Sequence, residues 1–232
     1  MRLLFFDMEF ADGRVPGSIF SFGYLVTDEE FRIIEAPTDL LIDPDSTWNA
    51  YVEEKILAYP KETVEASPRF PEVYERLSAL FASVDVAVGF AVGNDTRALA
   101  CDCRRYGLEP ISFRTFDMEK VCRLTEDHPD ARGLAGCVRA WCGEEPENQH
   151  RSDGDALATM QLLRGICRVK HVDPEMMLIA YPECIAESTA GAPTPKKSGR
   201  HRGGRRHRGR GGAKKNADDP SKKAKKEKSI DI

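Results

Sequence analysis

The chain has 232 residues, of which 31% are charged and 41% are hydrophobic, and its formal net charge is −4. This length suits one domain with a sizeable core, and no apolar run approaches the length needed to cross a bilayer. We also expect no secretory signal, because acids at positions 7 and 9 interrupt the first apolar run.

The charge is divided unevenly between two parts of the chain. Residues 186–232 hold 15 Lys and Arg against 5 Asp and Glu, a net of +10, whereas residues 1–185 carry a net charge of −14. The last part is rich in Gly, Arg and Lys and cannot bury enough apolar area to offset its ordering entropy. The sequence therefore predicts a folded domain over 1–185 and a disordered basic tail over 186–232.

Seven cysteines and the lack of a signal indicate reduced thiols in the cytoplasm, with a nuclear location as the alternative if the host has a nucleus. The pairs Cys101/Cys103 and Cys137/Cys142 lack a second matched pair with zinc-finger spacing. Buried thiols are therefore the preferred interpretation, and a zinc site is the alternative.

The pattern of the first 70 residues predicts three strands, at 3–9, 19–27 and 31–42, which are joined by short turns. Short connections favour an antiparallel meander. Pro37 cannot donate to a ladder, so it limits the third strand to an edge position or breaks it. A short helix is expected within 48–58.

From position 71 onward helices alternate with short strands. Asn94 is a plausible N-cap for the helix that follows the first of these strands. The pattern predicts an α/β fold with a mixed five-stranded sheet and helices on both faces. The expected strands are 84–90 and 111–116, and the expected helices are 71–81, 94–106, 117–124, 133–142, 154–169 and 174–180.

Asp7 and Glu9 interrupt the first strand at a spacing of two, which points both side chains to one face. Two neighbouring carboxylates on a buried strand are costly unless a cation neutralises them, and a divalent ion is the simplest solution. The alternative is that the strand ends at Asp7 and that water solvates both acids.

Three further residues could share a site with this pair. Asp95 and Asp155 each begin a predicted helix, where an acid can simply stabilise the helix N-terminus. His150 lies in a polar loop, where a histidine is more often a surface residue than a base.

Taken together, these residues resemble the DEDDh family of 3′-to-5′ exonucleases over most of the acidic domain. That family's three motifs match Asp7-Met8-Glu9, the segment from Gly89 to Asp95, and His150-Arg151 followed by Asp155-Ala156. The resemblance implies a ribonuclease H-like exonuclease fold. It also implies hydrolysis at the 3′ end of single-stranded nucleic acid, releasing nucleoside monophosphates.

The resemblance assigns catalytic roles to Asp7, Glu9, Asp95, His150 and Asp155. The four acids would hold two Mg²⁺ ions, for which Mn²⁺ can substitute, with Asp7 bridging the ions and His150 acting as general base. Asp153 lies close in sequence to Asp155, but the family pattern favours Asp155.

The chain departs from the family after Glu9, where Phe10, Ala11 and Asp12 replace the usual Thr-Thr-Gly. Those positions often contact the terminal nucleotide, so Phe10 and Ala11 are candidate substrate contacts and Phe10 could stack on a base. Phe90 and Ala91 also replace the usual His-Asn, and the effect of that change is left open.

The basic tail suits contact with phosphates, and its candidate residues are Arg200, Arg202, Arg205 and Arg206. A merely solubilising tail is the alternative. Gly/Arg tails are frequent on RNA-binding proteins, so RNA is weakly favoured over DNA. A non-catalytic nucleic-acid-binding or protein-interaction module is the second functional hypothesis. Many relatives are dimers, which leaves a homodimer open.

Overall fold

A six-stranded sheet organises the residues that the structure, a computed structural model, describes: 1–15, 17–146 and 151–189. The strand order is β3-β2-β1-β4-β5-β6. The strands are β1 (Arg2–Phe10), β2 (Ile19–Asp28), β3 (Ile33–Leu41), β4 (Val86–Gly89), β5 (Ser112–Asp117) and β6 (Ile185–Thr189). The helices are α1 (Ala50–Lys55), α2 (Lys61–Glu65), α3 (Phe70–Ala82), α4 (Gly93–Arg105), α5 (Met118–Thr125), α6 (Gly133–Cys142), α7 (Ser152–Lys170) and α8 (Pro174–Ala180), with a 3-10 turn, η1, over Pro182–Cys184.

Strand β1 lies in the middle of the sheet and is buried on both faces. It pairs antiparallel with β2 and parallel with β4. Because side chains alternate along a strand, Leu3 and Phe5 join one core cluster whereas Leu4 and Phe6 join the other. The apolar start of the chain thus forms a buried central strand, as predicted.

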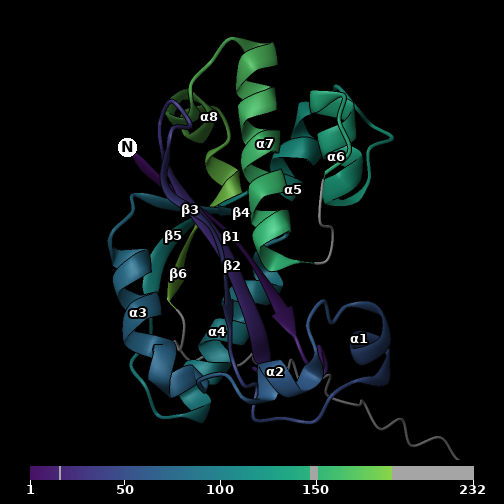
Figure 1. The fold of residues 1–232 in the computed structure, drawn as a ribbon. Coiled ribbons are helices and arrows are strands. Elements are labelled where there is room, and N and C mark those ends of the chain that lie inside the picture. Colours follow the sequence, from purple (N-terminus) through teal and green to yellow (C-terminus); the bar gives the residue numbers. More distant parts are fainter. Residues whose placement is uncertain (16, 147–150, 190–232) are drawn as a thin grey trace, which may run out of the picture. The chain divides into compact units, whose positions relative to one another are not determined.

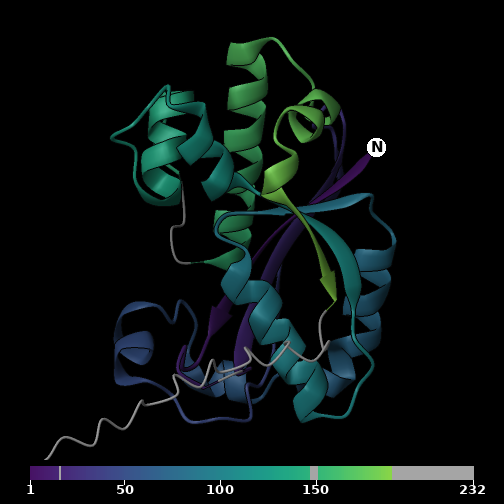
Figure 2. The same cartoon turned by 180° about the vertical axis from the view of Figure 1, so that it is seen from behind.

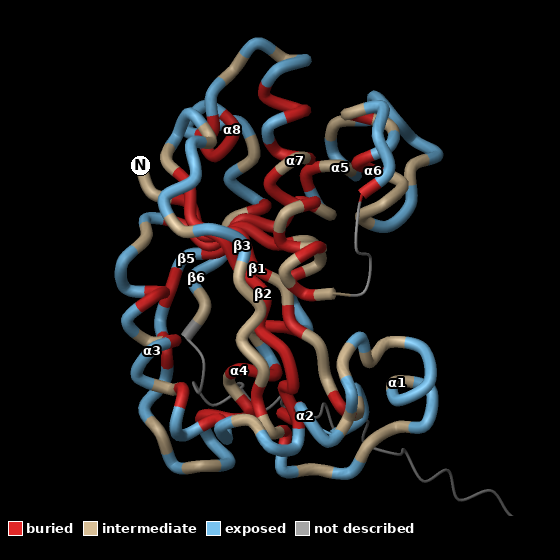
Figure 3. Tube along the Cα trace, in the orientation of Figure 1, coloured by how far each residue is buried: buried red, intermediate tan, exposed pale blue. Residues whose placement is uncertain are grey.

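Helices cover both faces of the sheet, which confirms the predicted α/β architecture. Helices α5, α6, α7 and α8 contribute to one core cluster, and α3 and α4 contribute to the other. Figures 1 and 2 show α7 in front of the sheet in one view and α4 in front of it in the opposite view. Buried residues follow the strands and recur along α7 (Figure 3).

Two predictions about the edges of the sheet have different outcomes. Pro37 does lie on an edge strand, β3, at an irregularity of register between the pairs Tyr24↔Thr38 and Val26↔Glu35. The sheet, however, has six strands and not five. The strand missed by the sequence analysis, β6, pairs antiparallel with β5 and continues past the predicted start of the tail at 186.

The cysteines are free thiols, and most of them are buried. Cys101, Cys103 and Cys137 are buried and Cys142 is half-buried, as the preferred interpretation expects. Within the described ranges, no group of cysteines has the geometry of a metal site. None of the helices found there is long and apolar enough to cross a membrane.

Candidate metal centre

The two acids of β1 point to the face of the sheet that α7 covers. Asp7 lies opposite Gly23 of β2, and Glu9 lies opposite Ser21. Met8, between them, belongs to the core cluster on the other face. Both carboxylates are half-buried. The predicted shared face is therefore confirmed, and the alternative in which the strand ends at Asp7 is not, because β1 continues to Phe10.

Helix α7 brings a third acid to this pair. Asp155 lies in the first turn of α7, where its backbone N–H donates to the carbonyl of Arg151 at 2.9 Å. One carboxylate oxygen from each of Asp7, Glu9 and Asp155 lies within 4.8 Å of the others. Asp153 instead pairs with Arg151 at 3.0 Å. In the structure it is therefore Asp155, and not Asp153, that joins Asp7 and Glu9.

A glycine allows this close approach of helix and sheet. A Cβ atom at Gly23 would lie 1.9 Å from the backbone carbon of Ser152 and 2.1 Å from the backbone nitrogen of Asp153. The first turn of α7 therefore rests directly on the backbone of β2. That contact places Asp155 over the row that contains Asp7 and Gly23.

Asp95 lies beside the three clustered acids. It occupies the first turn of α4 and is only 5% exposed. Its charge is, after burial, the largest influence that raises the pKa of Asp7. The predicted cap at Asn94 is wrong: α4 begins at Gly93, after Val92, so Asn94 is already inside the helix. The helix starts earlier because Val92 already has helical backbone angles and its carbonyl accepts the N–H of Thr96 at 3.0 Å.

Burial and mutual repulsion make these acids hard to ionise. Burial is the main cause in each case, and it raises the pKa of Asp7 well above the usual range and that of Glu9 and Asp95 to about 8. Neighbouring charge adds to the effect, mainly from Asp155 at Glu9 and from Asp117 at Asp95. Three acids that resist ionisation, with the Asp155 carboxylate close to two of them, form a site that a cation would stabilise.

The donor set fits magnesium or manganese. All four side chains offer carboxylate oxygens, which are hard ligands, and no thiol belongs to the described cluster. The spacing of the three clustered oxygens lets a single ion contact more than one of them. The residues present therefore fit the predicted divalent metal.

We expect the metal-free protein to lose stability as the pH rises. Acids with a raised pKa in the folded state bind more protons when folded than when unfolded, so stability falls between about pH 5 and about pH 8. The melting temperature should drop on the order of 5 °C over that range. Millimolar Mg²⁺ should restore it at pH 8 and have little effect at pH 5. Thermal unfolding with EDTA and with Mg²⁺ checks this; a melting temperature that rises with pH in EDTA would contradict it.

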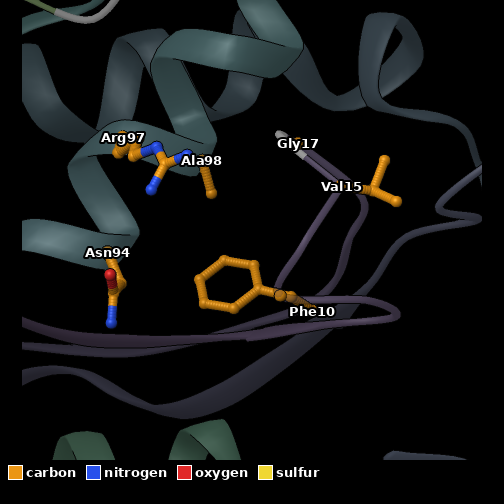
Figure 4. A pocket seen from close by; sticks show the side chains of 7 residues that line it. Phe10, Val15, Gly17, Asn94, Arg97 and Ala98 are labelled. Atoms are coloured by element: carbon orange, nitrogen blue, oxygen red, sulfur yellow. The ribbon is translucent and has the colours of Figure 1, made fainter. Parts of the chain in front are cut away.

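A small pocket lies where the residues after Glu9 meet helix α4. It has a volume of about 120 Å³ and lies between the end of β1, the segment after it and helix α4. Figure 4 shows the ring of Phe10 facing Asn94 and Arg97 of α4, with Val15 and Gly17 at the far side. Phe10 follows Glu9 and Asn94 precedes Asp95 in the sequence, but none of the four acids is among the residues that line the pocket.

The other predicted substrate residues have different positions. Ala11 is completely buried beside Phe20 and Val64, and its backbone N–H donates to Ser18 while its carbonyl accepts from Asn49. The structure therefore gives Ala11 a packing role and leaves its side chain no contact with substrate. His150, Arg200, Arg202, Arg205 and Arg206 lie outside the described residues.

Several polar residues near the acids were missed by the sequence analysis. Arg97 lines the pocket without a salt bridge to any described acid. Asp39 of β3 adds to the negative charge at Asp7 and Glu9, although it is at least thirty positions away from them in the sequence. Only the register of β2 and β3, which places Asp39 opposite Gly23, reveals this proximity.

No family model and no curated protein matches this sequence. Solved structures do match its fold, at 11–20% sequence identity. A 3′-exonuclease that recognises the histone mRNA stem-loop has a TM-score of 0.57 and 11% identity, covering 72% of this chain and 63% of that one. Exonuclease I has a TM-score of 0.60 and 20% identity, covering 78% and 43%. The nuclease domain of 3′hExo, a DEDDh family member bound to rAMP, has a TM-score of 0.59 and 11% identity, covering 73% and 91%.

These matches confirm the predicted exonuclease fold. The chain spans less than two thirds of the length of the first of these proteins and less than half of the second. At this level of identity the likeness concerns the arrangement of helices and strands.

Proposed function

We propose that this protein is a metal-dependent 3′-to-5′ exonuclease of the DEDDh type, acting on single-stranded nucleic acid. The observation that carries the proposal is the convergence of Asp7, Glu9 and Asp155 on the α7 face of an exonuclease fold, with the charge of Asp95 near Asp7. Three separate segments of the chain supply these acids. A cluster of this kind has no evident structural use, because the other three acids raise the pKa of Asp7, and Asp155 and Asp95 raise the pKa of Glu9.

In this proposal each acid has a defined part. Two Mg²⁺ or Mn²⁺ ions would be held by Asp7, Glu9, Asp95 and Asp155, with Asp7 as the ligand common to both. Bound ions would supply an activated water and stabilise the charge that develops on phosphorus and on the leaving oxygen. The acids would also position the scissile phosphate by holding the ions, and His150 would remove the proton from the attacking water. The products are nucleoside monophosphates.

The decisive experiment follows the degradation of an oligonucleotide labelled at its 5′ end. A 3′-to-5′ exonuclease shortens the labelled strand one nucleotide at a time in Mg²⁺ and not in EDTA. The competing hypothesis is a non-catalytic binding module on the same fold, which would bind the oligonucleotide and leave its length unchanged. A strand that stays intact in both Mg²⁺ and Mn²⁺ would reject the exonuclease.

RNA is the favoured substrate in this proposal, because the basic tail combines glycine with arginine. The histone mRNA exonuclease and the rAMP complex concern RNA, whereas another similar structure is a complex of E. coli ExoI with single-stranded DNA. Matched RNA and DNA oligonucleotides of one sequence should therefore be compared at equal concentration. Faster degradation of the DNA strand would overturn the preference for RNA.

The Phe10 pocket should bind the terminal nucleotide. We expect Phe10→Ala to raise KM about tenfold, since stacking of one base on an aromatic ring contributes about 1–3 kcal/mol. Arg97→Ala should also raise KM, because its guanidinium lines the same pocket and has no salt bridge with described acids. Steady-state kinetics with a short oligonucleotide measure both effects. Tyr51→Phe, at an exposed ring on α1, is the control. An unchanged KM in both pocket variants would exclude this pocket.

The basic tail should increase affinity for nucleic acid without taking part in the chemistry. Its removal should leave β6 intact, so the deletion should cover residues 190–232. We expect the affinity at low salt to fall about tenfold and the dependence of affinity on salt to become weaker. The rate of single-turnover cleavage at saturating enzyme should change less than about twofold.

A full-length control separates charge from chain length in this experiment. Changing Arg200, Arg202, Arg205 and Arg206 to glutamine should reproduce part of the loss of affinity. A deletion variant with the affinity and salt dependence of the intact protein would show that the tail only aids solubility. Residence in the cytoplasm and assembly as a homodimer also remain predictions, which cell fractionation and analytical ultracentrifugation can check.

A further inference from the structure

We propose that Asp39 and Tyr59 are positioning residues for the metal centre, because they hold the first turn of α7 and thereby Asp155. The inference rests on the proposed function, since it concerns how the same site is kept in shape. Neither residue belongs to the motifs of the sequence analysis.

Asp39 lies in the same row of the sheet as Asp7. Gly23 of β2 has Asp7 as its partner on one side and Asp39 on the other. Directly paired residues of antiparallel strands point to the same face, so Asp39 also faces α7. The glycine between them leaves room for the backbone of Ser152 and Asp153. The start of α7 thus lies over Gly23, between Asp7 and Asp39.

Hydrogen bonds connect Asp39 to the first residue of α7. Its Oδ1 accepts from the hydroxyl of Ser21, and Ser21 Oγ lies 2.7 Å from the hydroxyl oxygen of Ser152. Ser21 is 1% exposed and Ser152 is fully buried. Buried hydroxyls need partners, so this chain fixes where Ser152 can sit on the sheet. Asp155 is three residues further along the same helical turn.

Tyr59 closes the network from the segment between α1 and α2. Its hydroxyl donates to Asp39 Oδ2 at 2.6 Å, so both carboxylate oxygens of Asp39 have a donor. The guanidinium of Arg151 lies over the Tyr59 ring, 5.3 Å from its centroid, and also binds Asp153 through two hydrogen bonds of 3.0 and 3.1 Å. The backbone carbonyl of Arg151 in turn accepts a hydrogen bond from the backbone N–H of Asp155. Arg151 therefore contacts Tyr59 directly, Ser152 is connected to Asp39 through Ser21, and Asp153 is held by Arg151.

The role of Asp39 could instead be purely electrostatic. Its negative charge faces the same site and would attract cations without any effect on position. An asparagine at position 39 distinguishes the positioning mechanism from the electrostatic one. Asparagine keeps the size and one acceptor oxygen and offers an amide to the second hydroxyl, but it removes the charge. Rescue by asparagine therefore supports positioning.

The test measures ion binding directly as well as activity. Mn²⁺ binding to the full chain is followed by the electron paramagnetic resonance signal of the free ion, and kcat and KM are measured with an oligonucleotide. We expect Tyr59→Phe and Asp39→Ala to weaken Mn²⁺ binding and lower kcat about tenfold or more, with KM nearly unchanged. Asp39→Asn should stay within about threefold of the unmodified protein. Tyr51→Phe, on the nearby helix α1, should behave like the unmodified protein.

Two results would overturn the proposal. The first is a Tyr59→Phe variant whose Mn²⁺ affinity and kcat equal those of the unmodified protein. This variant should fold, because it keeps the ring that packs under Arg151. The second is failure of Asp39→Asn to recover what Asp39→Ala loses, which would assign the effect to charge. Failure of the proposed function looks different, because the unmodified protein would then neither bind Mn²⁺ at this site nor shorten the oligonucleotide.

Discussion

Replacing Asp7 by asparagine should reduce the rate of 3′-end hydrolysis about a thousandfold or more while leaving the protein folded. Asp7 lies at the centre of the site, since the charges of Asp95, Glu9, Asp155 and Asp39 all act on it. An amide of the same shape keeps the packing but removes the charge with which the side chain would bridge two ions. Asp155→Asn should have an effect of similar size.

The stability of these variants separates a catalytic role from a structural one. Asp7→Asn removes one of several repelling charges, so the metal-free protein should be at least as stable as the unmodified one at pH 8. It should also lose most of the stabilisation by Mg²⁺. Glu35→Gln is a suitable control, because Glu35 is an acid of β3 that pairs with Arg2 and lies away from the Asp39 row. Activity of Asp7→Asn within tenfold of the control would exclude this site.

Gly23→Ala should have the largest effect on stability, a loss of about 3 kcal/mol or more. The added methyl carbon would meet backbone atoms of Ser152 and Asp153 at 1.9–2.1 Å. Backbone cannot rotate away as a side chain can, so α7 would have to lift from β2. Any variant that still folds should therefore have a displaced Asp155 and weak activity. Urea unfolding and the oligonucleotide assay measure the two losses.

Gly136→Ala provides the matched control for that experiment. Gly136 lies inside α6, and a Cβ there would meet its nearest neighbours at 3.7 Å or more, which is ordinary contact. Alanine is favoured over glycine in a helix, so this change should stabilise the protein by up to about 1 kcal/mol. If Gly23→Ala is as stable as Gly136→Ala, the first turn of α7 cannot rest on β2 as described.

Residues near one another in the chain could be placed from the sequence alone. The spacing of Asp7 and Glu9 follows from the period of a strand, and the helix that begins near Asp155 follows from a long apolar pattern after a polar loop. Helices α6 and α8 have the predicted bounds, because glycine or proline marks their first turn.

Features that depend on pairing between distant segments could not be predicted. Strand β6 has Ile185 as its only large apolar residue, and it becomes a strand only because the edge of β5 is available to it. Asp39 is an ordinary acid in the sequence, and its nearness to Asp7 depends on the register across β2. Ala11 follows the motif directly, yet a turn after β1 places it in a separate apolar cluster. The position of Ala11 after Glu9 therefore predicts a contact with substrate, whereas the burial of its side chain prevents one.

The direction of β6 affects how a basic tail would work. Because β6 runs antiparallel to β5, Ile185 pairs near the end of β5 that leads toward the acids, whereas Thr189 pairs with Ser112 at the opposite end. Each residue of a strand adds roughly 3.3 Å, so β6 carries the chain roughly 13 Å along the sheet, away from the end of β5 that leads toward the acids. A tail that binds nucleic acid would then be attached away from the bond being cut. It would retain a long strand between successive cuts, so its contribution should appear in processivity.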